Sequence, residues 1–289
     1  MFRAGDHDAE LSEEEFRLLR DFIHEQFGLY YDDGQRTSLR SRLAGRLSLL
    51  GLLSFEDYYR YLRFAPGRAD ELQRMVSHLT NNETYFFREQ PQLQVLADTV
   101  LRRLKERKAE SGERTLRVLS AGCSTGEEAL TLAMIVYESA QFFWNWDVKV
   151  FGMDVDPEAL EKARRGVYHQ NSLRGVSPEK LERHFLRDGK EVKVKESIRR
   201  LVTFRPGNLL EAESYAGLHP LDVIFCRNVL IYFSDASIRK VAQIFHEVLG
   251  PGGYLFLGHA ESLARITDAF TPIRFQGAML YQKPEAAPR

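Results

Sequence analysis

The spacing of apolar residues changes near residue 80 of this chain. Up to that point apolar positions recur every three or four residues, which predicts amphipathic helices. Gly28 ends the first helical run, a second run extends from about residue 34 to residue 50, and Pro66 with Gly67 separates a third run from a fourth. The pattern therefore predicts an all-α region of four helices over residues 1–80.

From residue 115 onward, short branched apolar runs alternate with helical patterns. Residues 147–154 are apolar on alternate positions, and residues 221–225 form the nearly continuous apolar run that is typical of a central parallel strand. Residues 270–284 can supply a closing antiparallel strand pair. The alternation predicts an α/β fold over residues 115–289, with a doubly wound sheet.

One stretch interrupts this alternation. EVKVK at residues 191–195 has a strand period, Asp188 and Gly189 predict a turn, and residues 201–204 resemble a second strand. We therefore predict a small β-hairpin over about residues 188–200, inserted before the third core strand. Insertions of this kind commonly contact partners.

The loop after the first strand of the α/β region carries candidate binding chemistry. Gly122 and Gly126 can adopt positive φ and let a ligand lie against the backbone. In many α/β proteins, however, glycines at this place only allow the strand to pack closely against the helix. Asp154 ends the next strand, where a carboxylate can bind ribose hydroxyls. Asp156, followed by Pro157, fits a helix N-cap. The reverse assignment of the two acids stays open.

The segment that joins the two regions is polar and aromatic. Residues 80–93 read TNNETYFFREQPQL, unlike a flexible linker, which is rich in Gly and Ser. The composition indicates a segment that packs and forms hydrogen bonds, with Phe86 and Phe87 buried and Arg88 paired to a nearby acid.

Composition excludes several classes of protein. A net charge of −1 over 289 residues argues against a general nucleic-acid binder. Cys123 and Cys226 are far apart and lack metal-ligand spacing, so we expect no zinc site, no disulfide framework and a reducing compartment. The chain has no run long enough to cross a bilayer and no signal-peptide core at its start. We therefore expect a cytoplasmic protein without a metal and without membrane insertion.

Six motifs in order resemble those of the chemotaxis receptor methyltransferase (CheR) family: TNNETYFFRE, SAGCSTGEE, FGMDVDPEALEKARRGVY, GNLL, FCRNVLIYF and GGYLFLGHAES. The resemblance covers nearly the whole chain. It implies a class I methyltransferase domain with a small β-subdomain, preceded by a helical domain, with residues 81–114 contributing to the cofactor site. The implied activity is methylation of chemoreceptor glutamates by S-adenosylmethionine, with S-adenosylhomocysteine as product, for sensory adaptation. The implied partner is the cytoplasmic helical domain of the receptor, and the enzyme is expected to be a monomer.

The resemblance also assigns roles to residues. Tyr232 matches a residue near the transferred methyl, Arg88 is the second catalytic candidate, and the alignment of Arg102 with a substrate-orienting arginine stays open. Glu127 is placed near the methionine part of the cofactor, and Asp154 at the ribose. The implied cofactor-binding residues are Asn82, Thr84, Arg88, Gly122, Glu127, Asp154, Asn208, Leu209, Asn228 and Val229.

The implied chemistry needs no general base. A glutamate carboxylate, with an ordinary pKa near 4.3, is already the nucleophile at neutral pH. The protein must align it and remove water from it.

Four arginines of the second predicted helix are candidates for substrate docking. They flank its leucine stripe, where arginines also simply snorkel. An acidic receptor favours the docking interpretation. The short turn at Asp188 and Gly189 predicts an enzyme that does not use a receptor tail peptide. The four arginines are Arg36, Arg40, Arg42 and Arg46.

Three other functions compete with this interpretation. One is a non-catalytic module that binds S-adenosylmethionine and docks a signalling partner. A nucleotide-dependent oxidoreductase is disfavoured because the full G-x-G-x-x-G pattern is missing. Methylation of a small carboxylic acid is hard to reconcile with the added helical region and hairpin.

Overall fold

The computed structural model describes residues 9–139, 141–142 and 145–285. Its contacts divide the chain into two compact units. The helical unit comprises the residues up to Asn81 together with Tyr232–Ser234, and the sheet unit comprises Asn82–Ile231 and the residues from Asp235 onward.

The helical unit contains the four predicted helices. Ser12 and Glu15 form a capping box at the start of the first helix, and Gly28 ends it with a φ of 75°. The second helix begins slightly later than expected because a 3₁₀ turn capped by Asp32 precedes it. Leucines and aromatic side chains fill the core between the helices. The elements are α1 (Glu13–Phe27), η1 (Asp33–Gln35), α2 (Arg36–Leu50), α3 (Phe55–Phe64) and α4 (Arg68–Leu79).

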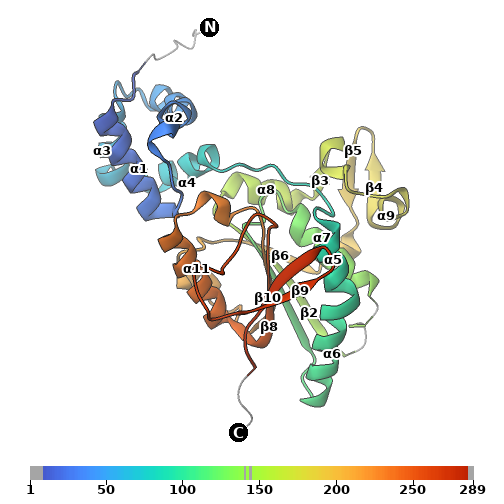
Figure 1. The fold of residues 1–289 in the computed structure, drawn as a ribbon. Helices are drawn as coiled ribbons and strands as arrows, with labels where there is room; N and C mark the ends of the chain where they lie inside the picture. Colours follow the sequence, from blue (N-terminus) through green and yellow to red (C-terminus); the bar gives the residue numbers. More distant parts are fainter. Residues whose placement is uncertain (1–8, 140, 143–144, 286–289) are drawn as a thin grey trace. The chain divides into compact units, whose positions relative to one another are not determined.

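A seven-stranded mixed sheet forms the centre of the sheet unit (Figure 1). Its order is β6-β2-β1-β7-β8-β10-β9, with the first five strands parallel and β10 antiparallel to both neighbours. The predicted α/β sheet and its closing antiparallel pair are therefore confirmed. The strands are β1 (Thr115–Ala121), β2 (Asp147–Asp154), β6 (Val202–Pro206), β7 (Leu221–Cys226), β8 (Leu249–Leu257), β9 (Thr271–Phe275) and β10 (Ala278–Gln282).

Helices pack against this sheet and connect its parallel strands. The helix α7 (Glu127–Glu138) contacts β1 and β2, α8 (Pro157–Arg165) contacts β2 and β6, and α11 (Asp235–Val248) contacts β8. A continuous helical segment precedes β1 and consists of α5 (Gln90–Val95), the π-helix η2 (Leu96–Val100) and α6 (Leu101–Glu110). Because the strand order reverses between β1 and β7, the carboxyl ends of these two strands border the crevice where such sheets bind ligands.

The predicted hairpin over residues 188–200 is wrong in its boundaries. The hairpin consists of β4 (Phe185–Asp188) and β5 (Glu191–Val194), and a third short strand, β3 (Val167–Tyr168), pairs with β5. The apolar run at residues 201–204 belongs to β6 of the large sheet, and α10 (Glu196–Arg199) lies between them. Figure 1 shows the small sheet, with α9 (Pro178–His184), set apart from the large one.

Two buried phenylalanines anchor the start of the sheet unit. Phe86 and Phe87 are both buried, as predicted, and they pack into the main core of this unit. Phe86 meets Tyr168 and Phe185 edge-on, with ring centroids 4.8 and 5.0 Å apart, respectively. These aromatic contacts join the first residues of the unit to its small sheet. No helix in the described ranges combines the length and apolarity needed to cross a membrane.

Candidate functional site at the carboxyl ends of the parallel strands

The loop after β1 is held in place by its neighbour strand. The N–H groups of Gly122 and Cys123 both donate to the Met153 carbonyl, at 2.8 and 3.0 Å. Gly122 has a φ of 75°, and an added Cβ would lie 2.6 Å from a methyl of Val229. The loops after β1 and β7 therefore touch at this glycine. The close approach that requires Gly122 in this structure comes from Val229.

Gly126 has the packing role that was the alternative to ligand binding for the glycines of this loop. A Cβ on Gly126 would lie 2.7 Å from the Cβ of Ala163 and 3.0 Å from the ring of Phe204. Its φ of 92° also lies in the left-handed region that favours glycine. Gly126 thus lets α7 start close to α8 and β6, which is a packing role.

Asp154 organises the carboxyl end of β2. Its Oδ2 accepts the Ser124 N–H at 2.6 Å and its Oδ1 accepts the Asp156 N–H at 2.9 Å. Asp154 is buried, and this burial raises its pKa to about 6 although both hydrogen bonds favour the ionised form. The carboxylate thus holds the loop after β1, and its remaining lone pairs can accept from a ligand hydroxyl.

Asp156 is the helix cap, so the preferred division of the two acids is confirmed for this residue. Its Oδ1 accepts the N–H groups of Glu158 and Ala159, at 2.9 and 3.2 Å. Its Oδ2 accepts from the Asn82 amide at 2.7 Å, and the Ser124 hydroxyl donates to Asn82 Oδ1 at 2.9 Å. Asn82 therefore links the start of the sheet unit to the ends of both β1 and β2.

Glu127 is buried at the start of α7. Its two oxygens accept from the hydroxyls of Thr125, at 2.6 Å, and Ser172, at 2.8 Å. Burial raises its pKa, and its two hydroxyl donors do not neutralise its charge. Burial raises the pKa of the Cys123 thiol, and the nearby carboxylates of Asp154, Glu128 and Glu127 raise it further. Glu128 is paired with Arg227, so the uncompensated negative charge near this loop is that of Asp154 and Glu127.

The loop after β7 carries Asn228 in a strained conformation. Asn228 has a φ of 61°, and its side-chain Oδ1 is buried without a hydrogen-bond partner among the residues that the structure describes. Such an atom is costly unless a bound group supplies a donor. The backbone of this loop bonds instead to Glu261, which sequence reasoning missed: Oε2 accepts from Asn228 and Oε1 from Val229, each at 2.9 Å. Glu261 lies in the quoted motif GGYLFLGHAES, but nothing in its spacing indicates this role.

Arg227 is a second residue that sequence reasoning missed. Its guanidinium is buried, donates to Glu128 at 2.7 Å and to the Arg88 carbonyl at 2.9 Å, and lies 3.7 Å from Glu89. Arg227 therefore ties β7 to α7 and to the polar segment before α5. The sequence offered only a weak signal, a cation directly after an apolar strand.

Arg88 itself does not fulfil the predicted pairing with an acid. Its guanidinium donates to the Glu83 carbonyl at 3.3 Å and lies over the ring of Tyr85. The Glu83 carboxylate instead binds Arg174, at 2.9 Å. Thr84 is half-buried in the same segment.

The loop after β6 holds the two residues predicted for the adenine side. Asn208 folds back on its own loop, accepting from the Leu210 N–H at 3.1 Å and donating to Glu211 at 3.2 Å. Leu209 is buried. Both residues follow the carboxyl end of β6, the strand beside β2.

Tyr232 belongs to the helical unit. Its carbonyl accepts the Tyr30 N–H at 2.8 Å, and its hydroxyl accepts from the Asn81 amide at 3.3 Å. The residue is 39% exposed. A place beside the transferred methyl stays a prediction for this residue.

The four candidate docking arginines differ sharply, and for Arg46 the docking prediction is wrong. Arg46 is only 6% exposed and makes a bidentate ion pair with Glu71, at 2.9 and 2.5 Å. Arg42 donates to the carbonyls at the end of α4, and Arg40 donates to the Ala9 carbonyl. Only Arg36 is classed as exposed. Burial of Arg46 follows from Glu71 on α4, a partner that the helical pattern of α2 does not reveal.

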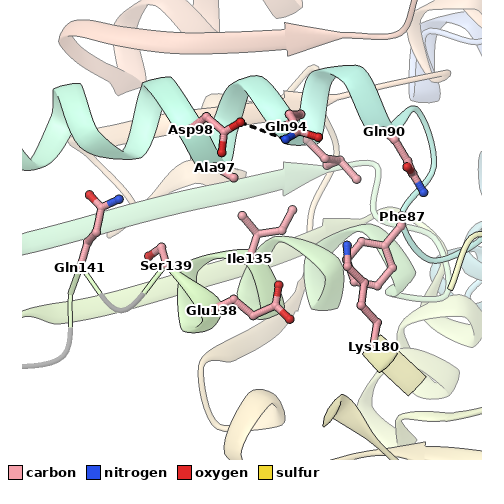
Figure 2. A pocket seen from close by; sticks show the side chains of 11 residues that line it. Phe87, Gln90, Gln94, Ala97, Asp98, Ile135, Glu138, Ser139, Gln141 and Lys180 are labelled. Atoms are coloured by element: carbon pink, nitrogen blue, oxygen red, sulfur yellow. Dashed lines mark hydrogen bonds between the residues drawn. The ribbon is translucent and has the colours of Figure 1, made fainter. Parts of the chain in front are cut away.

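A cavity of about 380 Å³ lies elsewhere in the sheet unit (Figure 2). It is bordered by α5 and η2 on one side and the second half of α7 on the other, with Lys180 of α9 near Phe87. Polar side chains such as Gln94, Asp98 and Glu138 line it. None of the predicted cofactor residues is among its lining residues, so this cavity is separate from the site at the carboxyl ends of the strands.

The arrangement at the strand ends suits a ligand with hydroxyl groups and positive charge. Its buried carboxylates are held by hydroxyl and backbone N–H groups, which leaves their negative charge in place, and Asn228 adds a free acceptor. No group of three or more His, Cys, Asp or Glu side chains that could hold a metal occurs in the described part of the chain.

Comparison with known proteins matches both units. The model described as CheR methyltransferase, all-alpha domain, matches residues 14–80, and the model described as CheR methyltransferase, SAM binding domain, matches residues 82–279.

Two curated relatives span nearly the same length. The chain is 36% identical over 275 residues to chemotaxis protein methyltransferase 2 of Vibrio cholerae, covering 95% of this chain and 94% of the relative. It is 37% identical over 268 residues to the chemotaxis protein methyltransferase of Escherichia coli, covering 90% and 88%. A solved structure of magnesium protoporphyrin IX methyltransferase from Synechocystis is 14% identical, covers 78% of this chain and 97% of that chain, and has a TM-score of 0.36. The family matches and the relatives together agree with the predicted resemblance, and the chain belongs to the CheR family of S-adenosylmethionine-dependent methyltransferases.

Proposed function

We propose that this enzyme methylates glutamate side chains in the cytoplasmic helical domain of chemoreceptors, forming glutamate methyl esters. The full-length similarity to relatives named chemotaxis protein methyltransferases carries this proposal. The strand-end site supports it, because its unneutralised carboxylates and the Asn228 acceptor fit S-adenosylmethionine, which is positively charged at sulfur. The proposal places the enzyme in the cytoplasm with its substrate.

The cofactor residues follow from this proposal. Bound S-adenosylmethionine supplies an activated methyl group. Asp154 accepts from the ribose, Asn208 and Leu209 border the adenine, and Asn228 with Val229 borders the sulfur. Glu127, Gly122, Asn82, Thr84 and Arg88 complete the site.

The protein's part in the reaction is positioning. A substrate carboxylate is ionised at neutral pH, so no side chain has to remove a proton from it. Tyr232 and Arg88 can donate hydrogen bonds that orient the carboxylate and replace the water around it. The expected loss on removing either donor is therefore one of alignment, and the enzyme needs no titrating base.

Charge attraction brings the acidic receptor to the helical unit. Of the four candidate arginines on α2, Arg36 is the exposed one and offers its positive charge to a partner. Rim charges of this kind mainly change association rates and apparent Michaelis constants.

Methyl transfer is the test. The purified enzyme is incubated with methyl-labelled S-adenosylmethionine and the cytoplasmic fragment of a chemoreceptor from the same organism. We expect label on the receptor that base releases, as for an ester, and none on a matched fragment whose methylation-region glutamates are replaced by glutamine. Cofactor binding without transfer to any receptor of that organism would instead favour the non-catalytic module.

A further inference from the structure

The loop after β7 is anchored through its backbone to one carboxylate. Oε2 of Glu261 accepts the N–H groups of Asn228, at 2.9 Å, and Gly258, at 2.6 Å. Oε1 accepts those of Val229, at 2.9 Å, and Ile231, at 3.2 Å. One side chain thus satisfies four backbone donors, three of them from the same loop. Donors at a carboxylate make strong, directional hydrogen bonds, so this contact fixes the loop conformation.

The side chain sits in a closely fitted position. Glu261 is 6% exposed, and a Cβ added to Gly258 would lie 2.8 Å from its Oε2 and 3.0 Å from the Asn228 nitrogen. All four donors are neutral, so no ion pair within this set competes for the carboxylate. Glu261 thus connects the loop after β7 to the backbone directly after β8.

The loop held by Glu261 contacts the loop after β1 at Val229, and it carries Asn228 in a strained conformation. Val229 lies against Gly122, and Asn228 keeps a φ of 61° with its buried Oδ1 unpartnered in the described part of the chain. A non-glycine residue in this conformation persists only where the surroundings determine it. Glu261 supplies two of the hydrogen bonds that do so, at Asn228 and Val229.

We propose that Glu261 is a positioning residue for the cofactor. It touches no reacting atom in this role. By holding residues 228–231 it keeps Asn228 and Val229 where they can meet S-adenosylmethionine. The inference rests on the cofactor-binding role proposed for those two residues, and it does not depend on which protein is methylated.

The test measures binding of S-adenosylhomocysteine by calorimetry, with no receptor present. Glu261→Gln keeps the shape of the side chain but replaces one carboxylate oxygen by an NH2 group, which cannot accept a hydrogen bond, opposite two of the four donors. We expect an affinity loss of about tenfold or more, because the loop is released. Far-UV circular dichroism and urea unfolding establish that the variant is folded.

Glu71→Gln is the matched control, since Glu71 is equally buried but lies in the helical unit. We expect it to lower stability while leaving the affinity for S-adenosylhomocysteine within about twofold of the parent. A folded Glu261→Gln enzyme with unchanged affinity would overturn the proposal, as would equal affinity losses in Glu261→Gln and Glu71→Gln.

Gly258→Ala provides a second variant that keeps the carboxylate. The added methyl crowds Glu261 Oε2 and the Asn228 nitrogen, so we expect the same kind of affinity loss, smaller than that of Glu261→Gln. Combining the two should cost less than the sum of the single losses, because both act on one contact. Additive losses, or unchanged affinity in Gly258→Ala, would contradict the role assigned to Glu261. Receptor methylation that fails while these binding results hold would count only against the proposed substrate.

Discussion

Three buried carboxylates, Glu71 in the helical unit and Asp154 and Glu261 in the sheet unit, bind different kinds of hydrogen-bond donor. In the helical unit, Glu71 receives the Arg46 guanidinium at 2.9 and 2.5 Å and the Tyr58 hydroxyl at 2.7 Å. In the sheet unit, Asp154 receives two backbone N–H groups and Glu261 receives four. All three acids are buried. They differ in whether a cation balances the charge.

This difference separates a structural from a functional use of the same chemical group. An ion pair inside the helical unit neutralises its own charge and joins α2 to α4. Acids held by backbone donors have no cation beside them within the described ranges of the chain, which suits a positively charged cofactor. Burial raises the pKa of Asp154 to about 6, and the backbone donors oppose this rise. We therefore expect that removing the cation beside Glu71 costs stability, whereas removing the carboxylate of Asp154 or Glu261 costs ligand affinity.

The largest expected effect is on stability, from Arg46→Ala. Removing the guanidinium leaves Glu71 as an uncompensated buried charge, which costs about 3–5 kcal/mol in the free energy of unfolding. Urea denaturation followed by circular dichroism measures it. The control is Arg36→Ala on the same helix, which should change stability by less than about 0.5 kcal/mol because Arg36 is exposed. Equal effects of the two substitutions would remove the distinction between them.

The next effect is on cofactor affinity, from Asp154→Ala. The substitution leaves the N–H groups of Ser124 and Asp156 without their acceptor and removes the proposed ribose contact, so we expect affinity for S-adenosylhomocysteine to fall about 100-fold. Asp147→Ala, at the exposed start of the same strand, is the matched control and should bind normally. If calorimetry shows that Asp154→Ala binds S-adenosylhomocysteine with an affinity within threefold of the parent, the ribose-binding role proposed for Asp154 is wrong.

A smaller effect is expected from pH. The pKa of Asp154 is raised to about 6, so the carboxylate that holds the site becomes protonated as the pH falls through that value. We expect affinity for S-adenosylhomocysteine to weaken by several-fold between pH 7 and pH 5.5, and this dependence to be reduced in Asp154→Asn. The free energy of unfolding changes in the opposite direction. Because the pKa of Asp154 is higher in the folded than in the unfolded protein, its contribution to stability is fully present below the unfolded pKa and is lost as the pH rises through about 6. Binding titrations and urea unfolding across this range check both signs.

The smallest effect is expected at the surface of the helical unit. Arg36→Glu should raise the apparent Michaelis constant for a receptor fragment by about threefold at low salt, because it reverses an exposed charge that attracts an acidic partner. Arg17→Glu on α1 is the control, since Arg17 is also exposed and carries the same charge. Affinity for S-adenosylhomocysteine should stay unchanged in both. If Arg17→Glu raises the constant as much as Arg36→Glu, the attraction is not specific to α2.

Local patterns in the sequence determined the helices, most of the strands and the helix-capping role of Asp156, one of the two acids after β2. The apolar spacing of residues 11–80 and the alternation after residue 115 identified both architectures, because burial of one face dictates the period of each element. Asp156 before Pro157 identified the cap of α8, since a cap depends only on adjacent residues. The quoted motifs also identified the family.

Only the tertiary structure decided which distant segments meet. Arg46 is buried because Glu71 stands opposite it, the strand at residue 185 joins the hairpin because residue 194 pairs with it, and Gly122 faces Val229. Glu261 binds Asn228, 33 residues earlier in the chain. Such contacts depend on which segments the fold brings side by side, and the local period of apolar residues does not record that pairing. The sequence by itself thus determined the elements and the family, whereas the neutral donors around the buried carboxylates became visible only in the fold.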